Sequence, residues 1–238
     1  SDKGSLNLEL VDGLLNKLSG DVTRIESSFM FYNKSLTSID LPSVKSIGND
    51  FLYLNESLKS VNLPLVERIG DEFLYRNLSL ESIDLPLVSV IGGQFISRNE
   101  SSLKNVNLPS AVIIGDEFLK YNESLENLNL PSAQMIGYNF LYNNEYLTSV
   151  NLPNIAAIGE SFMRRNQSLK NIDFPLLKKV QSNFLSRNEN IEKVNLPLAT
   201  EIGSGFLTNN KYLNSIIYGL KCRTTNKLYI GSTIKSLN

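Results

Sequence analysis

The side chains that most often perform catalysis are scarce in this chain of 238 residues. It contains no His, and Cys222 is its one thiol. His-based acid–base catalysis, Cys–His nucleophiles, intramolecular disulfides and Cys/His zinc sites are therefore excluded. No group of metal-binding carboxylates with a general base can be assembled either, so we expect no metal, no cofactor and no complete active site.

Charge and hydropathy narrow the class of protein further. The 23 Lys and Arg balance 24 Asp and Glu, so no overall field attracts nucleic acid or an anionic membrane. Hydrophobic residues make up 42% of the chain, enough for a buried core. The longest apolar run, residues 111–114, is far shorter than the roughly 20 residues of a membrane span. We expect a soluble monomer, and the residues do not distinguish an intracellular from a cell-surface or secreted location.

A fixed period organises almost the whole chain. Every proline marks one repeat, and the intervals are 22 residues with a single interval of 23: positions 42, 64, 86, 109, 131, 153, 175 and 197. Nine Phe and nine Asn keep the same period. A period of this length predicts a solenoid of stacked coils.

Each position in the unit S-L-x-x-I-x-L-P-x-x-x-x-I-G-x-x-F-L-x-x-N has an expected structural role. Residues 36–41 predict a short strand, which Pro42 ends because it has no N–H to donate. Gly48 is expected at a corner, where it can adopt conformations that other residues resist. The pair Phe51 and Leu52 predicts a short helical or 3-10 turn that returns the chain to the next strand.

This unit resembles the BspA-like leucine-rich repeats, which occur on bacterial and protist cell surfaces and often carry Cys where this chain has Asn. The resemblance covers roughly residues 22–216. It implies an α/β leucine-rich-repeat solenoid with a parallel β-sheet on the concave face and short helical or 3-10 turns on the convex face. It also implies a protein that binds proteins or surface ligands and is not an enzyme.

The Asn that closes each unit is interpreted as structural. At a tight interior corner its amide can donate to one backbone carbonyl and accept from a backbone N–H, so stacked coils form an asparagine ladder. The ladder residues are Asn55, Asn77, Asn99, Asn122, Asn144, Asn166 and Asn188. Six N-x-S sequons begin at such positions (33, 55, 77, 99, 122 and 166), but glycosylation is disfavoured because a ladder Asn faces inward.

Two columns of polar residues are expected on the outer face of the sheet. One column contains only Asp and Asn: Asp40, Asn62, Asp84, Asn107, Asn129, Asn151, Asp173 and Asn195. It is either a stripe that contacts a ligand or, as favoured here, a hydrogen-bonded ladder. The neighbouring column includes Lys59, Glu81, Lys104 and Glu126. Its alternating charge favours solubility and cross-strand pairing over binding of a single charged ligand.

A row of arginines precedes the ladder Asn, at Arg76, Arg98, Arg165 and Arg187, with Lys120 and Arg164 nearby. It is either a basic ridge for a polyanion or a solvated edge. The solvated edge is favoured, because the overall charge is balanced and no aromatic residues interleave the row.

The two ends depart from the repeat. Apolar residues at helical spacing predict a helix over residues 5–20, within an N-terminal helical cap of residues 1–21: Leu10, Val11, Leu14, Leu15 and Leu18. The solenoid of about nine coils then spans residues 22–215. Residues 216–238 are expected to form a C-terminal hairpin cap or the start of another domain.

The C-terminal tail resembles the opening hairpin of GIY-YIG nuclease domains. Ile217-Tyr218, ten residues, then Tyr229-Ile230-Gly231 carry the likeness, although Ile216 stands in place of the first Gly. The resemblance implies that Tyr218 and Tyr229 belong to an active site whose Arg and Glu would lie beyond residue 238. Nucleic acid is an expected partner only under this interpretation.

The leading hypothesis is a noncatalytic leucine-rich-repeat scaffold that recognises a protein or surface ligand through its concave face. Its expected contacts are Lys59, Glu81, Lys104, Glu126, Asp40, Asp84 and Asp173. The alternative is the targeting region of a GIY-YIG endonuclease, truncated before its catalytic residues.

Overall fold

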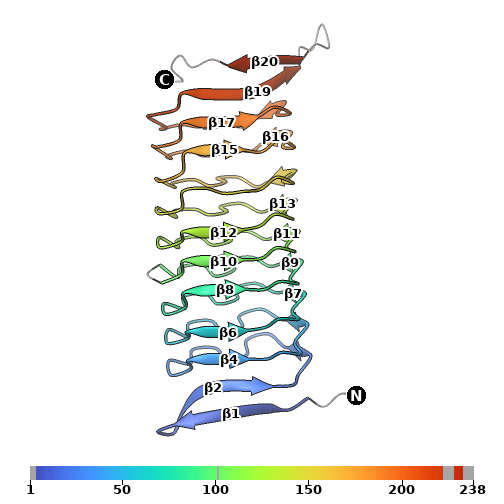
Figure 1. Cartoon of the computed structure of the whole chain (residues 1–238), viewed down its shortest axis with the longest axis vertical. Coiled ribbons are helices and arrows are strands. Elements are labelled where there is room, and N and C mark those ends of the chain that lie inside the picture. Colours follow the sequence, from blue (N-terminus) through green and yellow to red (C-terminus); the bar gives the residue numbers. More distant parts are fainter. Residues whose placement is uncertain (1–3, 101, 222–227, 233–238) are drawn as a thin grey trace.

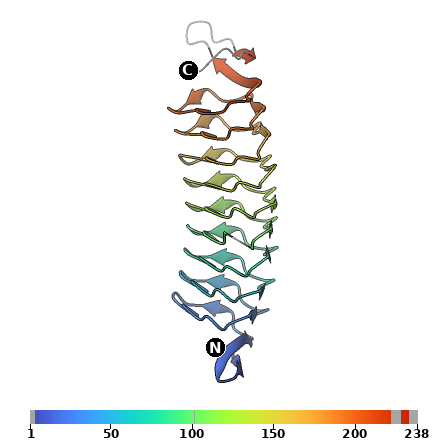
Figure 2. The same cartoon turned by 90° about the vertical axis from the view of Figure 1, so that its left-hand side faces the viewer.

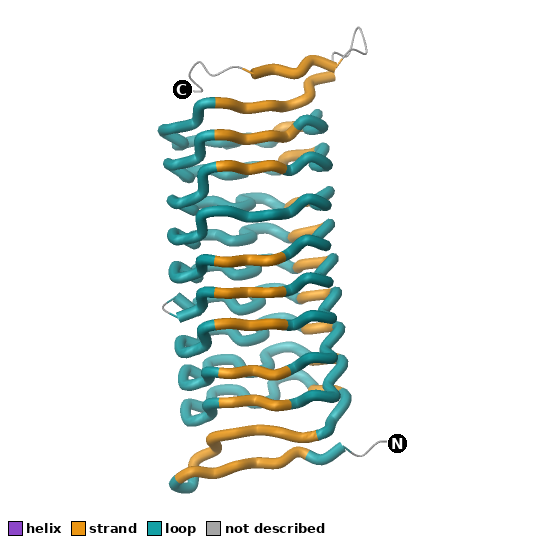
Figure 3. Tube along the Cα trace, viewed as in Figure 1, coloured by secondary structure: helices purple, strands orange, loops and turns teal. Residues whose placement is uncertain are grey.

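The chain forms a column of stacked coils with a β-hairpin at each end (Figure 1). The structure, a computed structural model, describes residues 4–100, 102–221 and 228–232. Figure 3 shows short strands joined by loops, and the described residues contain no helix. Each regular coil has three sides: a strand of the first sheet, a strand of the second sheet, and a run of turns.

The first sheet is built from the strand before each proline. Its strands are β4 (Ser38–Asp40), β6 (Ser60–Asn62), β8 (Ser82–Asp84), β10 (Asn105–Asn107), β12 (Asn127–Asn129), β15 (Asn171–Asp173) and β17 (Lys193–Leu196). The hydrogen-bonded pairs of strands are parallel and in register with the repeat, so that Ile39 pairs with Val61, although in the described part of the chain no strand pairing joins β6 to β8 or β12 to β15. An isolated bridge between Asn129 and Asn151 continues the ladder where the next coil has no named strand.

A second parallel sheet, absent from the sequence prediction, follows each proline corner. Its two-residue strands are β3 (Arg24–Ile25), β5 (Ser46–Ile47), β7 (Arg68–Ile69), β9 (Val90–Ile91), β11 (Ile113–Ile114), β13 (Met135–Ile136), β14 (Ala157–Ile158), β16 (Lys179–Val180) and β18 (Glu201–Ile202). Figure 2, turned by 90°, shows both series of strands rising along the column. The prediction of one strand per coil was therefore wrong.

The third side, which we define as residues 49–54 and the equivalent segments of the other coils, is not helical as predicted. Asp50, Leu52 and Leu54 have φ values of 58°, 61° and 57°, and this alternation recurs in later coils. It turns Phe51 and Leu52, which are adjacent, both into the core. Their backbone bonds also run between coils, since Leu52 N–H donates to the Phe29 carbonyl at 3.3 Å. A helix would instead direct those groups along its own axis.

The core is a set of columns that continue from coil to coil. Phe rings stack along the third side, with ring centroids 5.2 Å apart for Phe95 and Phe118 and 4.8 Å apart for Phe140 and Phe162. These rings are fully buried. Each coil therefore covers the apolar residues of the coil before it, which is the property that lets a repeat without a globular core fold.

The asparagine ladder predicted from the sequence is present and buried. Asn122 is fully buried, and its Nδ2 donates to the Ile96 carbonyl of the preceding coil at 2.8 Å. Its Oδ1 accepts the Asn99 N–H at 3.1 Å. Equivalent amide bonds reach the carbonyl of a positive-φ residue of the preceding coil, which is buried in every case except the partly buried Met30, from Asn55, Asn77, Asn99, Asn144, Asn166 and Asn188. A glycan on such an Nδ2 would break the bond and need space that a buried side chain does not have.

The corner glycines are required by close packing of backbones rather than by an unusual φ. A Cβ on Gly92 would lie 2.5 Å from the Gly70 carbonyl carbon, and a Cβ on Gly115 would lie 2.5 Å from that of Gly92. No corner glycine from Gly48 to Gly203 has a positive φ. The sequence-based prediction of a corner at this glycine was right. Its reason, that the corner needs a conformation which other residues resist, was wrong.

The N-terminal segment is a hairpin, and the predicted helical cap over residues 5–20 is wrong. Strands β1 (Leu6–Val11) and β2 (Leu14–Gly20) are antiparallel, and Asp12 and Gly13 form the turn with φ values of 50° and 76°. Asp-Gly favours a two-residue hairpin turn because both positions need a positive φ. β2 then pairs in parallel with β4, which buries Leu18.

The C-terminal end is also an antiparallel hairpin, which both expectations for residues 216–238 contain. β19 (Ser215–Lys221) continues the first sheet beside β17, and β20 (Leu228–Ser232) pairs with it. The connecting residues 222–227, which include Cys222, and residues 233–238 lie outside the described part of the chain.

Adjacent glycines provide a test of the close packing between coils. Replacing Gly92 with Ala should destabilise the protein by about 1–3 kcal/mol, because the new Cβ meets backbone that cannot move without disturbing the stack. Gly93 is the matched control, since its Cβ would make an ordinary contact at 3.4 Å. Chemical denaturation of both variants measures the difference. A Gly93→Ala variant as unstable as Gly92→Ala would contradict the explanation.

Removal of one ladder side chain tests the role of the buried amide. Asn122→Ala leaves the Asn99 N–H unpaired and leaves the Ile96 carbonyl only its long bond from Asn99 Nδ2 at 3.5 Å, so a loss of about 2–4 kcal/mol is expected in denaturant unfolding. Asn129→Ala removes an amide bond of similar length, 2.7 Å, but on the exposed face of the first sheet. That control should lose less than about 1 kcal/mol, and equal losses would show that burial of the ladder is unimportant.

Candidate binding surfaces

The Asp and Asn column lies on the outer face of the first sheet and is hydrogen-bonded along the stack. Asn62 Nδ2 donates to Asp40 Oδ1 at 2.8 Å, and Asn195 Nδ2 donates to Asp173 Oδ1 at the same distance. A longer chain of bonds joins Asn129 to Asn107 at 2.7 Å and Asn107 to Asp84 at 2.8 Å. These contacts agree with the favoured interpretation of the column as a ladder, and they hold its side chains in fixed orientations.

The charged column that precedes the strands is exposed on the same sheet. Lys59, Glu81, Lys104 and Glu126 occupy successive coils, and the Lys104 N–H donates to the Glu81 carbonyl at 2.8 Å. Within the described residues, however, no ion pair joins any of these four side chains. The expected cross-strand charge pairing is therefore not formed, and the four charged groups face solvent.

A shallow groove of about 480 Å³ crosses the first sheet beside the coil that contributes no named strand to this sheet. Asp173 lines it, together with Asn151, Asn171, Lys193 and Asn195. Of the predicted contact residues only Asp173 lies here. Asn171 and Lys193 were not singled out from the sequence, although their column is visible once the repeats are aligned.

The arginine row is interleaved with tyrosines, which corrects the sequence interpretation. The Arg98 guanidinium lies 4.8 Å from the centre of the Tyr121 ring, and Lys120 Nζ lies 5.4 Å and 5.6 Å from the rings of Tyr121 and Tyr142. Arg165 lies 5.7 Å from the Tyr142 ring. Tyr121 directly precedes the ladder Asn122, so it lies in the same column as Arg98, whereas Tyr142 lies one position earlier in its own coil.

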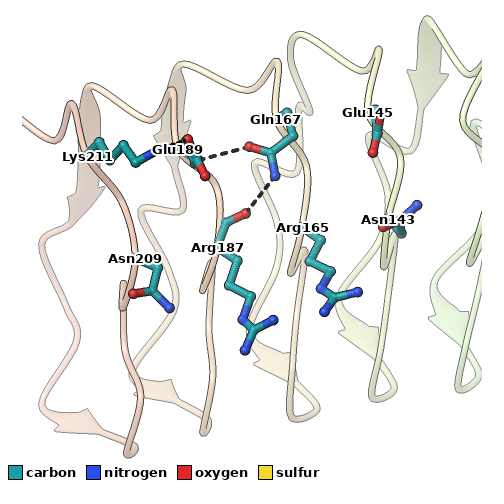
Figure 4. A pocket seen from close by; sticks show the side chains of 8 residues that line it. All are labelled: Asn143, Glu145, Arg165, Gln167, Arg187, Glu189, Asn209 and Lys211. Atoms are coloured by element: carbon teal, nitrogen blue, oxygen red, sulfur yellow. Dashed lines mark hydrogen bonds and ion pairs between the residues drawn. The ribbon is translucent and has the colours of Figure 1, made fainter.

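A second groove, of about 530 Å³, follows this row toward the C-terminal end of the column. Its lining residues come from four consecutive coils (Figure 4): Asn143, Glu145, Arg165, Gln167, Arg187, Glu189, Asn209 and Lys211. Lys211 pairs with Glu189 at 2.6 Å, and this bond raises the pKa of Lys211. Within the described residues Arg165 and Arg187 form no ion pair.

The third side has a different character near the N-terminal end. Tyr53 stacks between Phe31 and Tyr75, with centroid distances of 4.8 Å and 4.9 Å. Burial, followed by the charges of Asp50 and Asp71, raises the pKa of Glu72. Folding thus disfavours the ionised form of Glu72. The contribution of Glu72 to the stability of the folded protein therefore falls as pH rises past the pKa that this residue has in the unfolded chain. This part of the surface is aromatic and acidic, whereas the part near Arg165 is basic.

The tail residues that resemble a nuclease hairpin are described only by their backbone. Tyr218 pairs with Gly231 and Tyr229 pairs with Leu220 across the β19–β20 hairpin. A hairpin of this kind is common to the cap and the nuclease interpretations, so it does not distinguish them. Across the described residues, no group of three or more Cys, Asp or Glu side chains is placed to hold a metal.

Membrane insertion as a helix is also not indicated. The part of the chain that the structure describes holds no helix of the length and hydropathy that a bilayer crossing requires.

Comparison with known proteins identifies the repeat. The family model for the BspA-type leucine-rich repeat region (6 copies) matches residues 23–146 and 134–238. No curated protein matches the chain. Among solved structures, a leucine-rich repeat protein from Bacteroides ovatus is similar, with 18% identity and a TM-score of 0.63 over 93% of this chain and 71% of that chain. At this identity the likeness concerns the fold alone. The family model covers most of the repeats on which the column is built, and the chain therefore belongs to the BspA-type leucine-rich repeat family.

Proposed function

We propose that this chain is a noncatalytic recognition scaffold that binds a protein or surface ligand through the outer face of the first sheet. The observation that carries the proposal is the row of unpaired charges at Lys59, Glu81, Lys104 and Glu126. Charged side chains without internal partners remain available to a ligand. The side chains of Lys59, Glu81 and Lys104 belong to successive coils, and the backbones of these coils are hydrogen-bonded to one another.

The rigidity of this face supports the same role. The Asp and Asn ladder beside the charged row orders side chains that would otherwise lose entropy on binding. Asp40, Asp84 and Asp173 each use one carboxylate oxygen as an acceptor within the ladder, which fixes the direction of the carboxylate. Repeat proteins commonly recognise ligands through such an extended surface. The family to which the chain belongs is consistent with this role.

Substitution of the charged row tests the proposal. A variant that combines Lys59→Ser, Glu81→Ser and Lys104→Ser should bind any ligand of this face with an affinity at least about tenfold lower, because several charged contacts disappear together. The measurement is quantitative mass spectrometry of proteins retained from a cell-surface extract on the immobilised wild-type chain, followed by affinity measurement for each retained protein.

The second sheet offers a matched control. Lys45, Glu67 and Lys178 are exposed and precede second-sheet strands as the charged row precedes first-sheet strands. Their triple substitution by Ser changes the net charge equally and should leave binding unchanged. Retention that survives the first-sheet substitutions, or that falls equally in the control, would rule out this face.

A further inference from the structure

The groove near the C-terminal end of the column is lined by two chemically different rows (Figure 4), one from residues that precede the ladder Asn in the sequence and one from residues that follow it. The residues directly before the ladder Asn form what we name the amide–arginine row: Asn143, Arg165, Arg187 and Asn209. The residues directly after it form the carboxylate row: Glu145, Gln167, Glu189 and Lys211. Coils in this packing repeat about every 4.8 Å, so each row is an evenly spaced series.

The two arginines are positioned for an external anion. In Figure 4 the side chains of Arg165 and Arg187 extend in the same direction, away from the carboxylate row. Neither forms an ion pair within the described residues. Arg165 is also held against the Tyr142 ring at 5.7 Å. A guanidinium restrained in this way loses less entropy when it binds a carboxylate or sulfate.

Arg164 supplies a second cation at the same ring. Its guanidinium lies 5.9 Å from the centre of Tyr142, and its Nε is buried without a hydrogen-bond partner within the described residues. The tyrosine therefore has cations within 6 Å from two adjacent positions, Arg164 and Arg165, and a third in Lys120. Lys120 is paired with Glu117 at 2.9 Å, so the positive charge beside the groove comes from Arg164 and Arg165. The three cations leave the ring less available for stacking by a ligand.

The carboxylate row is suited to hydroxyl groups. Gln167 Nε2 donates to the Arg187 carbonyl at 3.2 Å, and Gln167 Oε1 accepts the Glu189 N–H at 3.3 Å, so the middle of the row is fixed. Glu189 is bound to Lys211, whereas Glu145 forms no ion pair within the described part of the chain. Carboxylates and amides beside arginines offer acceptors for hydroxyls next to donors for acid groups.

We propose that this groove binds an anionic polysaccharide, whose acid groups contact Arg165 and Arg187 and whose hydroxyls contact Glu145 and the neighbouring amides. A polynucleotide carries a phosphate at every linkage, so its charges would also approach Glu145 and Glu189. It would in addition need free aromatic faces for its bases, and the Tyr142 ring is occupied by cations. A neutral polysaccharide would leave the two arginines without partners. The site lies apart from the first sheet and does not rest on the function proposed above.

Binding of defined polymers to the full chain tests this assignment. The probes are a heparin octasaccharide, which carries sulfates and carboxylates, an oligogalacturonate, which carries carboxylates alone, and neutral dextran of similar length. Titration calorimetry at low ionic strength should detect at least one of the two anionic saccharides and no dextran. Tighter binding of heparin would indicate that the arginines prefer sulfate groups. Tighter binding of oligogalacturonate would indicate that they prefer carboxylates. If neither anionic saccharide binds, the proposal is wrong.

Substitutions locate the site. Arg165→Ser with Arg187→Ser should weaken saccharide binding at least about tenfold, since two charge-assisted contacts are lost. The control, Arg68→Ser with Lys178→Ser, removes two exposed cations elsewhere and should change affinity less than about twofold. Glu145→Gln keeps the hydrogen-bonding capacity and removes a negative charge, so binding should persist or tighten. Equal losses in the control would show nonspecific charge attraction and overturn the site.

Two further polymers decide the class of ligand. Single-stranded dT20 and poly-glutamate are negatively charged polymers that lack the hydroxyl groups of a polysaccharide. Both should bind more weakly than the better anionic saccharide, and circular dichroism of each variant should match the wild type. If either polymer binds more tightly and loses that binding in the Arg165→Ser, Arg187→Ser variant, the groove is a nucleic-acid or acidic-peptide site and the saccharide assignment fails.

Discussion

From Asn55 to Asn188 a buried side-chain amide at one corner of each coil donates to the backbone of the preceding coil, and this corner is where the chain needs it most. The third side alternates between positive and negative φ, so the carbonyl of its buried positive-φ residue points toward the next coil. The ladder Asn of that next coil donates to this carbonyl. At five ladder positions its oxygen also accepts the N–H of the Asn before it: Asn55, Asn99, Asn122, Asn166 and Asn188. Non-Gly residues in the left-handed region cost about 1–2 kcal/mol each, so the conformation persists only where such bonds and core packing stabilise it.

This coil-to-coil bonding explains why surface chemistry in the molecule is organised in columns. Because each coil is in register with the next, a residue at one repeat position lies beside the residues at the same position in its neighbours. Function then depends on how a column changes along the stack. On the third side Tyr53 and Glu72 give way to Arg98 and Arg165, so two chemically different surfaces share one backbone conformation.

How far the sequence predicts the structure depends on how local each interaction is. The period, the core columns and the buried Asn follow from spacing alone, because they repeat without change. Three features do not: the second sheet, the non-helical third side and the N-terminal hairpin. A two-residue strand such as β7 has no periodicity to detect, and a Phe-Leu pair is compatible with a helix until its coil-to-coil bonds are known.

In residues 5–20 helical spacing and strand alternation coexist, and the Asp12-Gly13 turn decides between them. The contact of Arg98 with Tyr121, which occupy the same repeat position in adjacent coils, was missed because only the basic residues of that position were compared.

The single coil of 23 residues shows which parts of the repeat are constrained and which are free. Across it, the Asn99 N–H still donates to Asn122 Oδ1 at 3.1 Å, and Phe95 still stacks on Phe118 at 5.2 Å. In the sequence, alignment with the other repeats places the extra residue between the ladder Asn99 and the buried Leu103. The carboxylate row of the groove comes from this same segment in later coils. A segment that tolerates insertion without disturbing the ladder or the core can also vary its side chains freely, which makes it the part of each coil best able to acquire binding specificity.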